Sequence, residues 1–141
     1  VAEFGTVKVH KIMEIVRFSH VQHVSSEVMG VIKKGEDMFS SLASNFPAGT
    51  LSGAPKIEAM KIIDREEKEP RGIYGGAVGH FGFNGGCSFA IPIRSLFISG
   101  KEAYAQTAGG IVYDSTAENE HQEILNKLAP MQKVLLSFEK K

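Results

Sequence analysis

The chain has 141 residues, and its 16 lysines and arginines balance 16 aspartates and glutamates, so its formal net charge at pH 7 is zero. This balance argues against a protein that binds nucleic acid or anionic membrane surfaces without sequence preference, because such proteins carry a basic excess. Hydrophobic residues at 43% and charged residues at 23% are typical of a globular chain and exclude a disordered one.

A single cysteine, Cys87, excludes an internal disulfide framework and a cysteine zinc cluster. No apolar run approaches the roughly 20 residues that a membrane helix needs. The first residues, VAEFGTVKV, lack the pattern of a secretory signal. These features predict a soluble, cytoplasmic protein with neither nucleic acid nor membrane among its partners.

The first half of the chain predicts one long strand followed by two helices. Residues 16–32 are rich in β-branched side chains and lack helical spacing, which favours a strand with Val16 and His23 on opposite faces. A short helix is expected after Gly35. A second helix is expected to begin at Pro55, because proline at the first helical position sacrifices no hydrogen bond.

The second half predicts antiparallel strands. Strands are expected over 73–83 and 87–99, joined by a turn at Asn84-Gly85-Gly86, because asparagine and glycine tolerate positive φ. Another strand is expected near Tyr104, after a second turn. Pro92 removes one ladder donor and indicates an edge or a bulge. The order of elements predicts an α+β fold.

The last segment, from about Ala117, has the apolar spacing of a helix, which Pro130 is expected to kink or divide. Glu120 and Glu123 lie three residues apart and are therefore neighbours on one helical face. Adjacent carboxylates repel, so such a pair suits a cation, and Mg²⁺ prefers one or two carboxylates together with water and substrate oxygens. A solvated acidic first turn, favoured by the helix dipole, is the alternative.

Three other features suggest a ligand, each with a structural alternative. Small residues in FPAGTLSGAPK, residues 46–56, allow close approach of a carboxylate or phosphate to a helix start, or form an ordinary connection. The alternating glycines of RGIYGGAVGHF, residues 71–81, fit either a ligand or tightly packed backbone. Arg94 can bind a carboxylate through its fork or reach solvent. His23 is a candidate acid or base, or a structural histidine.

Several strings together resemble one family. In order along the chain, they are GTVKV, FSHVQH, FPAGTLSGAPKIEAMKIIDREE, RGIYGGAVGHF, FAIPIRS and IVYDSTAENEHQEILNK. They resemble the C-terminal part of the chorismate-utilising enzymes, which include anthranilate, aminodeoxychorismate, isochorismate and salicylate synthases. FSHVQH and the SGAPKIEAM helix look most similar to prokaryotic anthranilate synthases.

The resemblance implies antiparallel sheets packed orthogonally, with helices on the outside. It implies the conversion of chorismate and ammonia into anthranilate and pyruvate in tryptophan biosynthesis, by a lyase that depends on Mg²⁺. The other synthases of the family are the alternatives. A noncatalytic chorismate-binding module is the alternative from another class.

The resemblance also implies roles for individual residues. His23 matches an active-site histidine near the substrate ring, and Thr50 matches a threonine that lines the substrate pocket. The positions that bind substrate carboxylates fall on Tyr74, Arg94, Gly109 and Gly110. The Mg²⁺ positions fall on Glu120 and Glu123. QTAGGIV, residues 106–112, stands where the family usually has QAGAGIV, which alters the carboxylate-binding loop.

By the same resemblance, residues 1–141 are expected to be the C-terminal portion of a chorismate-binding domain in a longer chain, beginning after the segment that supplies further metal-site glutamates. The expected partners are chorismate, a glutamine amidotransferase subunit that delivers ammonia, and the remainder of the large subunit. We expect no turnover from the chain alone. A sheet edge left open favours a homo-oligomer or aggregation.

Overall fold

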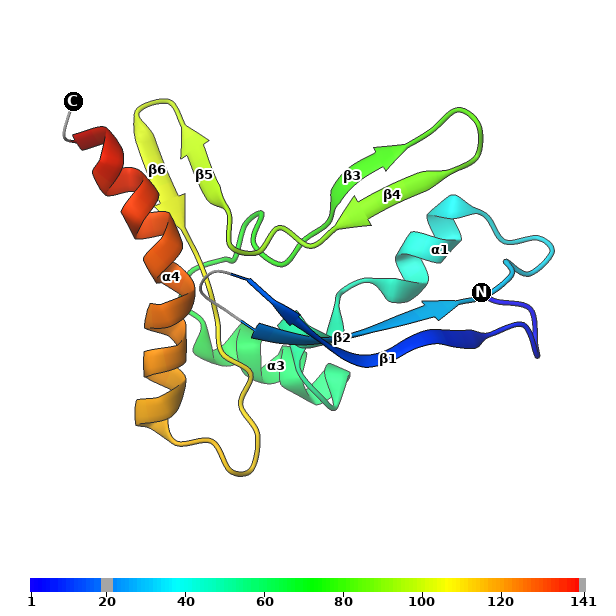
Figure 1. The fold of residues 1–141 in the computed structure, drawn as a ribbon, viewed down its shortest axis with the longest axis horizontal. Coiled ribbons are helices and arrows are strands. Elements are labelled where there is room, and N and C mark those ends of the chain that lie inside the picture. Colours follow the sequence, from blue (N-terminus) through cyan, green and yellow to red (C-terminus); the bar gives the residue numbers. More distant parts are fainter. Residues whose placement is uncertain (19–21, 140–141) are drawn as a thin grey trace. The chain divides into compact units, whose positions relative to one another are not determined.

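The computed structural model describes residues 1–18 and 22–139 and has an α+β composition with antiparallel strand pairs (Figure 1). The chain forms two compact units. Unit 1 comprises Val1–Phe46 and Gly79–Phe89, and unit 2 comprises Pro47–Val78 and the chain from Ala90 onward. The expected fold class is confirmed, whereas the orthogonal packing of the sheets remains a prediction.

Unit 1 contains a hairpin of β1 (Lys8–Arg17) and β2 (Gln22–Met29), which pair in antiparallel fashion. The expected single strand over 16–32 is therefore wrong. The β-branched composition continues through both strands, and no glycine, proline or Asn-Gly pair marks the reversal. Val16 pairs directly with His23, so these two residues share a face instead of occupying opposite ones. His20, the other histidine of FSHVQH, lies outside the described residues.

The expected short helix is confirmed as α1 (Met38–Asn45). It begins three residues after Gly35 because Asp37 caps it. The Asp37 carboxylate accepts hydrogen bonds from the backbone N–H groups of Phe39 (3.0 Å) and Ser40 (2.9 Å). In return, the Asp37 N–H donates to the Ser40 hydroxyl (2.8 Å), which completes a capping box.

The turn at residues 84–86 is confirmed, and it joins β3 (Val78–Phe81) to β4 (Cys87–Ala90). A Cβ added to Gly79 would lie 2.0 Å from the Ser88 carbonyl oxygen. At this position the glycine pattern therefore serves close packing of backbone. The ring of Phe81 packs against two other phenylalanines of unit 1, with centroid distances of 4.5 Å to Phe39 and 4.7 Å to Phe89.

Unit 2 begins with a helix that the sequence did not predict, α2 (Gly49–Ser52), followed by α3 (Lys56–Glu66). The helix α3 begins at Lys56, one residue later than expected, and Pro55 is the residue immediately before it. The two helices meet closely, since a Cβ on Gly53 would lie 3.0 Å from the Cβ of Ala59.

Both long strands expected in the middle of the chain are shorter than predicted. The chain turns before Val78, where the N–H of Tyr74 donates to the Arg71 carbonyl oxygen (3.1 Å). The expected strand over 87–99 is interrupted, because Pro92 has no N–H and Arg94 adopts a positive φ of 51°. Only its ends form strands.

The next strand, β5 (Leu96–Ser99), pairs antiparallel with β6 (Glu102–Ala105), which confirms the expected strand near Tyr104. The Phe97 and Tyr104 rings stack across this pair with centroids 5.1 Å apart. The C-terminal helix is confirmed as α4 (Ala117–Glu139). It continues through Pro130 as one helix, so the suggested second helix is wrong. No helix among the described residues is long and apolar enough to cross a membrane.

Few apolar side chains are buried. Among the described residues, only Tyr74 and Met131 count as buried hydrophobic side chains, at 6% and 4% exposure. The hairpin of β1 and β2 exposes large apolar side chains at many positions: Val9, Ile12, Met13, Ile15, Val24, Val28 and Met29. Apolar surface on this scale is typical of a face that packs against further protein.

The close approach of Gly79 to the Ser88 carbonyl oxygen predicts that alanine destabilises the fold more at Gly79 than at a glycine with open space around it. Gly79→Ala should lower the free energy of unfolding by about 2 kcal/mol or more, because the new methyl group collides with backbone rather than with a flexible side chain. The matched control is Gly49→Ala, where a Cβ has no neighbour within 4 Å. Urea unfolding measures both, and equal stabilities of the two variants would contradict the prediction.

Candidate functional site

His23 lies in β2, is half-buried and belongs to unit 1. Its ring makes an edge-on contact with Phe18, with centroids 6.0 Å apart and an interplanar angle of 67°. The other site residues expected from the sequence belong to unit 2. Thr50 among them is exposed in α2.

Tyr74 is buried beside a cationic clamp formed by Arg71. The Arg71 guanidinium donates to the Glu67 carboxylate through Nε (2.7 Å) and Nη2, and to the Leu51 carbonyl oxygen through Nη1 (2.7 Å). Its central carbon lies 6.0 Å from the centroid of the Tyr74 ring. The clamp thus fastens the turn that carries Tyr74 to the end of α3 and to α2.

The hydrogen bonds of this clamp shift the pKa of both partners. Hydrogen bonding from Arg71 lowers the pKa of the Glu67 carboxyl, against a smaller opposing effect of burial. The same bonds raise the pKa of Arg71. Glu67 and Arg71 are therefore held in their charged forms.

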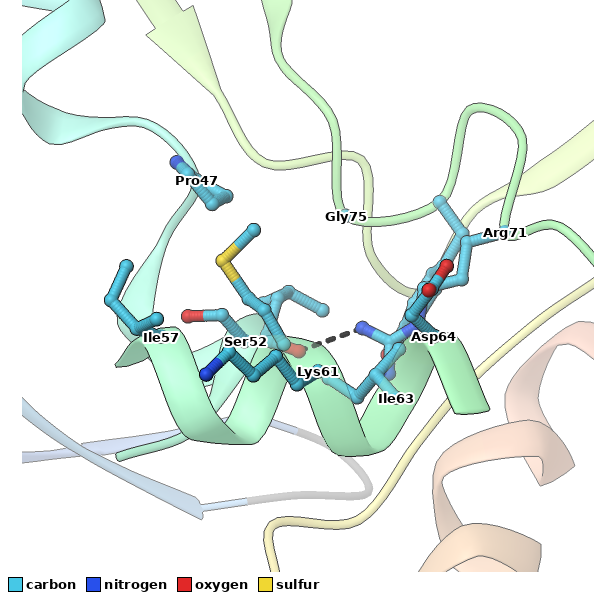
Figure 2. A pocket seen from close by; sticks show the side chains of 11 residues that line it. Pro47, Ser52, Ile57, Lys61, Ile63, Asp64, Arg71 and Gly75 are labelled. Carbon is cyan, nitrogen blue, oxygen red and sulfur yellow. Dashed lines mark hydrogen bonds between the residues drawn. The ribbon is translucent and has the colours of Figure 1, made fainter. Parts of the chain in front are cut away.

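A pocket of about 560 Å³ lies beside this clamp (Figure 2). It is formed by α2, α3 and the turn before β3, and its walls are mostly apolar. The lining residues are Pro47, Leu51, Ser52, Ile57, Met60, Lys61, Ile63, Asp64, Arg71, Tyr74 and Gly75. Of the site residues expected from the sequence, only Tyr74 lines it. The sequence signals for this pocket were the run of small residues at 46–56 and the glycine-rich string at 71–81.

Arg94 lies in the loop before β5 rather than inside a strand, and it is half-buried. The loop is linked to the Tyr74 turn, because the Gly75 N–H donates to the Pro92 carbonyl oxygen (3.5 Å). Among the described residues, the Arg94 guanidinium has no ion pair or hydrogen bond to a side chain. A half-buried cation in this state suits an anionic ligand.

Glu120 lies in the first turn of α4 and faces the glycine loop, which we define as residues 108–112. Its Oε1 accepts a hydrogen bond from the Ser115 hydroxyl (2.6 Å). Its Oε2 is buried without a hydrogen-bond partner among the described residues. A Cβ on Gly109 would lie 2.9 Å from this oxygen, so a larger residue there would displace the Glu120 carboxylate. Gly110 is exposed, and a Cβ there would meet nothing within 4 Å.

Glu123 lies one turn further along α4, with a side chain 52% exposed. Its Oε1 lies 2.6 Å from Nζ of Lys127, which also donates to the Ala108 carbonyl oxygen (3.1 Å). The Lys127 side chain is 19% exposed. Sequence reasoning missed Lys127, although its position four residues after Glu123 is the spacing of a helical ion pair.

These carboxylates fit a hard divalent cation. A buried carboxylate oxygen without a partner, as at Glu120, is costly unless something satisfies it. Mg²⁺ needs only one or two carboxylates when water and substrate supply the other oxygens. The described part of the chain gathers no group of three His, Cys, Asp or Glu side chains, so Glu120 and Glu123 would not form a complete protein cage.

Apart from Thr50, which is exposed in α2, the structure places the expected site residues of unit 2 in two groups. Tyr74 and Arg94 lie on two linked segments. Gly109 lies against Glu120, and Glu123 is connected to the same loop through Lys127. Within the described ranges, no hydrogen bond or ion pair joins one group to the other. The assigned roles of these residues remain predictions.

Comparison with known proteins identifies the family. Residues 1–133 match the family described as chorismate binding enzyme, and the chain belongs to it.

The relatives are more specific. The chain is 61% identical over 137 residues to anthranilate synthase component 1 of Leptospira biflexa, a match that covers 96% of this chain and 30% of that protein. It is 50% identical over 127 residues to anthranilate synthase component 1 of Cereibacter sphaeroides, covering 90% and 25%. The crystal structure of anthranilate synthase component I from Streptococcus pneumoniae TIGR4 matches with a TM-score of 0.85 at 43% identity, covering 90% of this chain and 29% of that one. The chain spans less than a third of the length of these relatives.

The Glu67–Arg71 pair predicts a pH-dependent stability. Because the pKa of Glu67 is lowered in the folded state, its contribution is complete above the unfolded value of about 4.5 and is lost as the pH falls through the folded value. Glu67→Gln should destabilise the fold at pH 7 by about 1 kcal/mol or less, since the pair is partly exposed.

The loss of unfolding free energy in Glu67→Gln, relative to the parent protein, should be smaller at pH 3 than at pH 7. Chemical denaturation at the two pH values measures this loss. The control is Glu66→Gln, which removes the exposed neighbour of Arg65. A Glu67→Gln deficit that stays constant between the two pH values would contradict the assignment.

Proposed function

We propose that this chain contributes the carboxylate-binding and Mg²⁺-binding elements of an anthranilate synthase large subunit. That enzyme converts chorismate and ammonia into anthranilate and pyruvate. The observation that carries the proposal is the buried, unpartnered Oε2 of Glu120 beside the glycine loop. The similarity to proteins named anthranilate synthase component 1 supports the choice of reaction.

The substrate carries two carboxylates, and unit 2 offers donors for them. The half-buried Arg94 supplies a fork that matches a carboxylate in two places. Tyr74 supplies a hydroxyl on the segment linked to the Arg94 loop. Backbone N–H groups at Gly109 and Gly110 supply further donors on the side of α4. Together these groups fix the orientation of the ring before any bond changes.

Glu120 and Glu123 are the proposed Mg²⁺ ligands. When bound, the ion supplies positive charge that favours departure of the C4 hydroxyl group of the substrate. Glu120 contributes its unpaired oxygen, which the fold keeps away from water. Glu123 contributes a carboxylate that pairs with Lys127 when no ion is bound.

Ammonia adds at C2 of the ring while the ring double bonds shift and the C4 hydroxyl leaves as water with a proton from the added ammonia. Loss of the C2 proton and cleavage of the C3–O bond then give the aromatic product and enolpyruvate, which takes up a proton to become pyruvate. We assign the C2 proton to the His23 imidazole, and to Thr50 a place in the wall of the substrate site. Both assignments rest on the family resemblance. Imidazole is the side chain that most often accepts a proton in catalysis.

The proposal includes partners. Ammonia comes from a glutamine amidotransferase subunit, and the remainder of the large subunit covers the apolar faces that the described residues expose. Homo-oligomer formation through the same faces is the alternative for the isolated chain. We propose a cytoplasmic location for the assembled enzyme.

The decisive test uses the complete large subunit that carries this segment, with chorismate, Mg²⁺ and ammonia, and detects anthranilate by its fluorescence. Arg94→Gln should lower kcat/KM by about 100-fold or more, because a charged bidentate contact to the substrate is lost. The control Arg65→Gln changes an exposed arginine of α3 and should leave kcat/KM unchanged. Absence of anthranilate from the parent subunit would refute the reaction, and equal activity of the Arg94 variant would refute the assigned role.

The isolated chain of 141 residues should show no turnover, because it offers only part of a metal site and little buried core. The same fluorescence assay measures this. Calorimetric titration with chorismate and Mg²⁺ tests the rival hypothesis of a noncatalytic binding module. Binding by the complete subunit without any product would favour that module.

A further inference from the structure

Ser115 connects Glu120 to one end of the glycine loop. Its hydroxyl donates to Oε1 of Glu120 (2.6 Å) and accepts a hydrogen bond from the backbone N–H of Val112 (3.0 Å). One hydroxyl therefore orients the carboxylate and fixes the loop at residue 112. Any rotation of the Glu120 carboxylate must stretch or break this chain of two hydrogen bonds.

Lys127 connects Glu123 to the other end of the same loop. Its ammonium group pairs with Oε1 of Glu123 (2.6 Å) and donates to the carbonyl oxygen of Ala108 (3.1 Å). The side chain is largely buried, at 19% exposure, so solvent screens these contacts less than those of a surface pair.

The two links flank the glycines. Ala108 and Val112 are the ends of the glycine loop, and each is tied to a different carboxylate by a different side chain. Between these ties, Gly109 lies close to Oε2 of Glu120, and a Cβ there would come within 2.9 Å and displace the carboxylate. The loop is thus linked to α4 through Lys127, through the close approach of Gly109 and, indirectly, through Ser115.

We propose that Ser115 and Lys127 are positioning residues that couple the Glu120–Glu123 pair to the backbone N–H groups of the glycine loop. The inference rests on the proposed function of that loop and of the two carboxylates. Neither residue is assigned a contact with reacting atoms. Each acts by holding one end of the loop in register with α4.

The coupling has a physical cause. A cation bound at the carboxylates competes with the Lys127 ammonium for Oε1 of Glu123, whereas the Ser115 hydroxyl keeps Oε1 of Glu120 and leaves Oε2 to the ion. The contact of Lys127 with the loop therefore changes when the cation binds, and substrate bound at the loop must alter cation affinity by the same factor. Loop and cation site are linked without direct contact between their ligands.

The first test measures amide hydrogen exchange of the peptide 106–112 in the complete large subunit, without substrate or Mg²⁺. Lys127→Met keeps most of the aliphatic stem and removes the ammonium, and it should speed exchange in this peptide about tenfold. Ser115→Ala should act in the same direction. Lys127→Arg should restore protection, and Lys101→Met, at an exposed turn, should change nothing.

The second test measures steady-state kinetics of the same variants. Lys127→Met should raise the KM for chorismate about tenfold while kcat changes less than about threefold, because the loop is mispositioned but the chemistry is intact. The dependence of this KM on Mg²⁺ concentration should be weaker than in the parent subunit. A purely structural lysine would lower the melting temperature without these effects.

The outcomes separate the two proposals. Unchanged exchange at 106–112 together with an unchanged KM overturns the positioning role. A parent subunit that forms no anthranilate overturns the proposed function, whereas the exchange result still decides whether Lys127 holds the loop. If Lys127→Met does not fold, Ser115→Ala and Lys127→Arg carry the same comparison.

Discussion

The buried carboxylate of Glu120 is the interaction on which the candidate site depends. It lies in the first turn of α4, where a serine hydroxyl satisfies one oxygen and a nearby glycine leaves space for the other. The second oxygen has no partner among the described residues, which is unusual for a buried charge. In the proposed function this oxygen binds the cation, and the neighbouring glycine loop is held to the same helix through Lys127.

Much of the secondary structure followed from the sequence, for identifiable reasons. The helices at Met38–Asn45 and Ala117–Glu139 carry apolar spacing, and an Asn-Gly turn defines the hairpin around residue 85. The hairpin of β1 and β2 was missed because the sequence between the two strands has no glycine, proline or Asn-Gly pair. The shortened strand before Leu96 was missed because the positive φ of Arg94 is not a property that an arginine side chain signals.

The candidate site, too, was predicted only in part from the sequence. Sequence resemblance selected Glu120, Glu123, Gly109 and Arg94, and the structure places the first three around one loop. The spacing of Glu123 and Lys127 was a signal for their ion pair, but nothing in the sequence indicated how Lys127 and Ser115 reach the glycine loop. Those connections run through a backbone carbonyl and a backbone N–H, and main-chain groups carry no information about residue type.

The proline within α4 affects how rigidly the helix holds its charged side chains. Pro130 provides no N–H for the carbonyl four residues earlier, which removes one rung of the hydrogen-bond ladder. The two carboxylates precede this gap, Lys127 lies within the turn that it spans, and the buried Met131 follows Pro130. A bend at the missing hydrogen bond would therefore move Lys127 relative to Glu120 and Glu123, so the tie from α4 to the glycine loop depends on the straightness of the helix at this point.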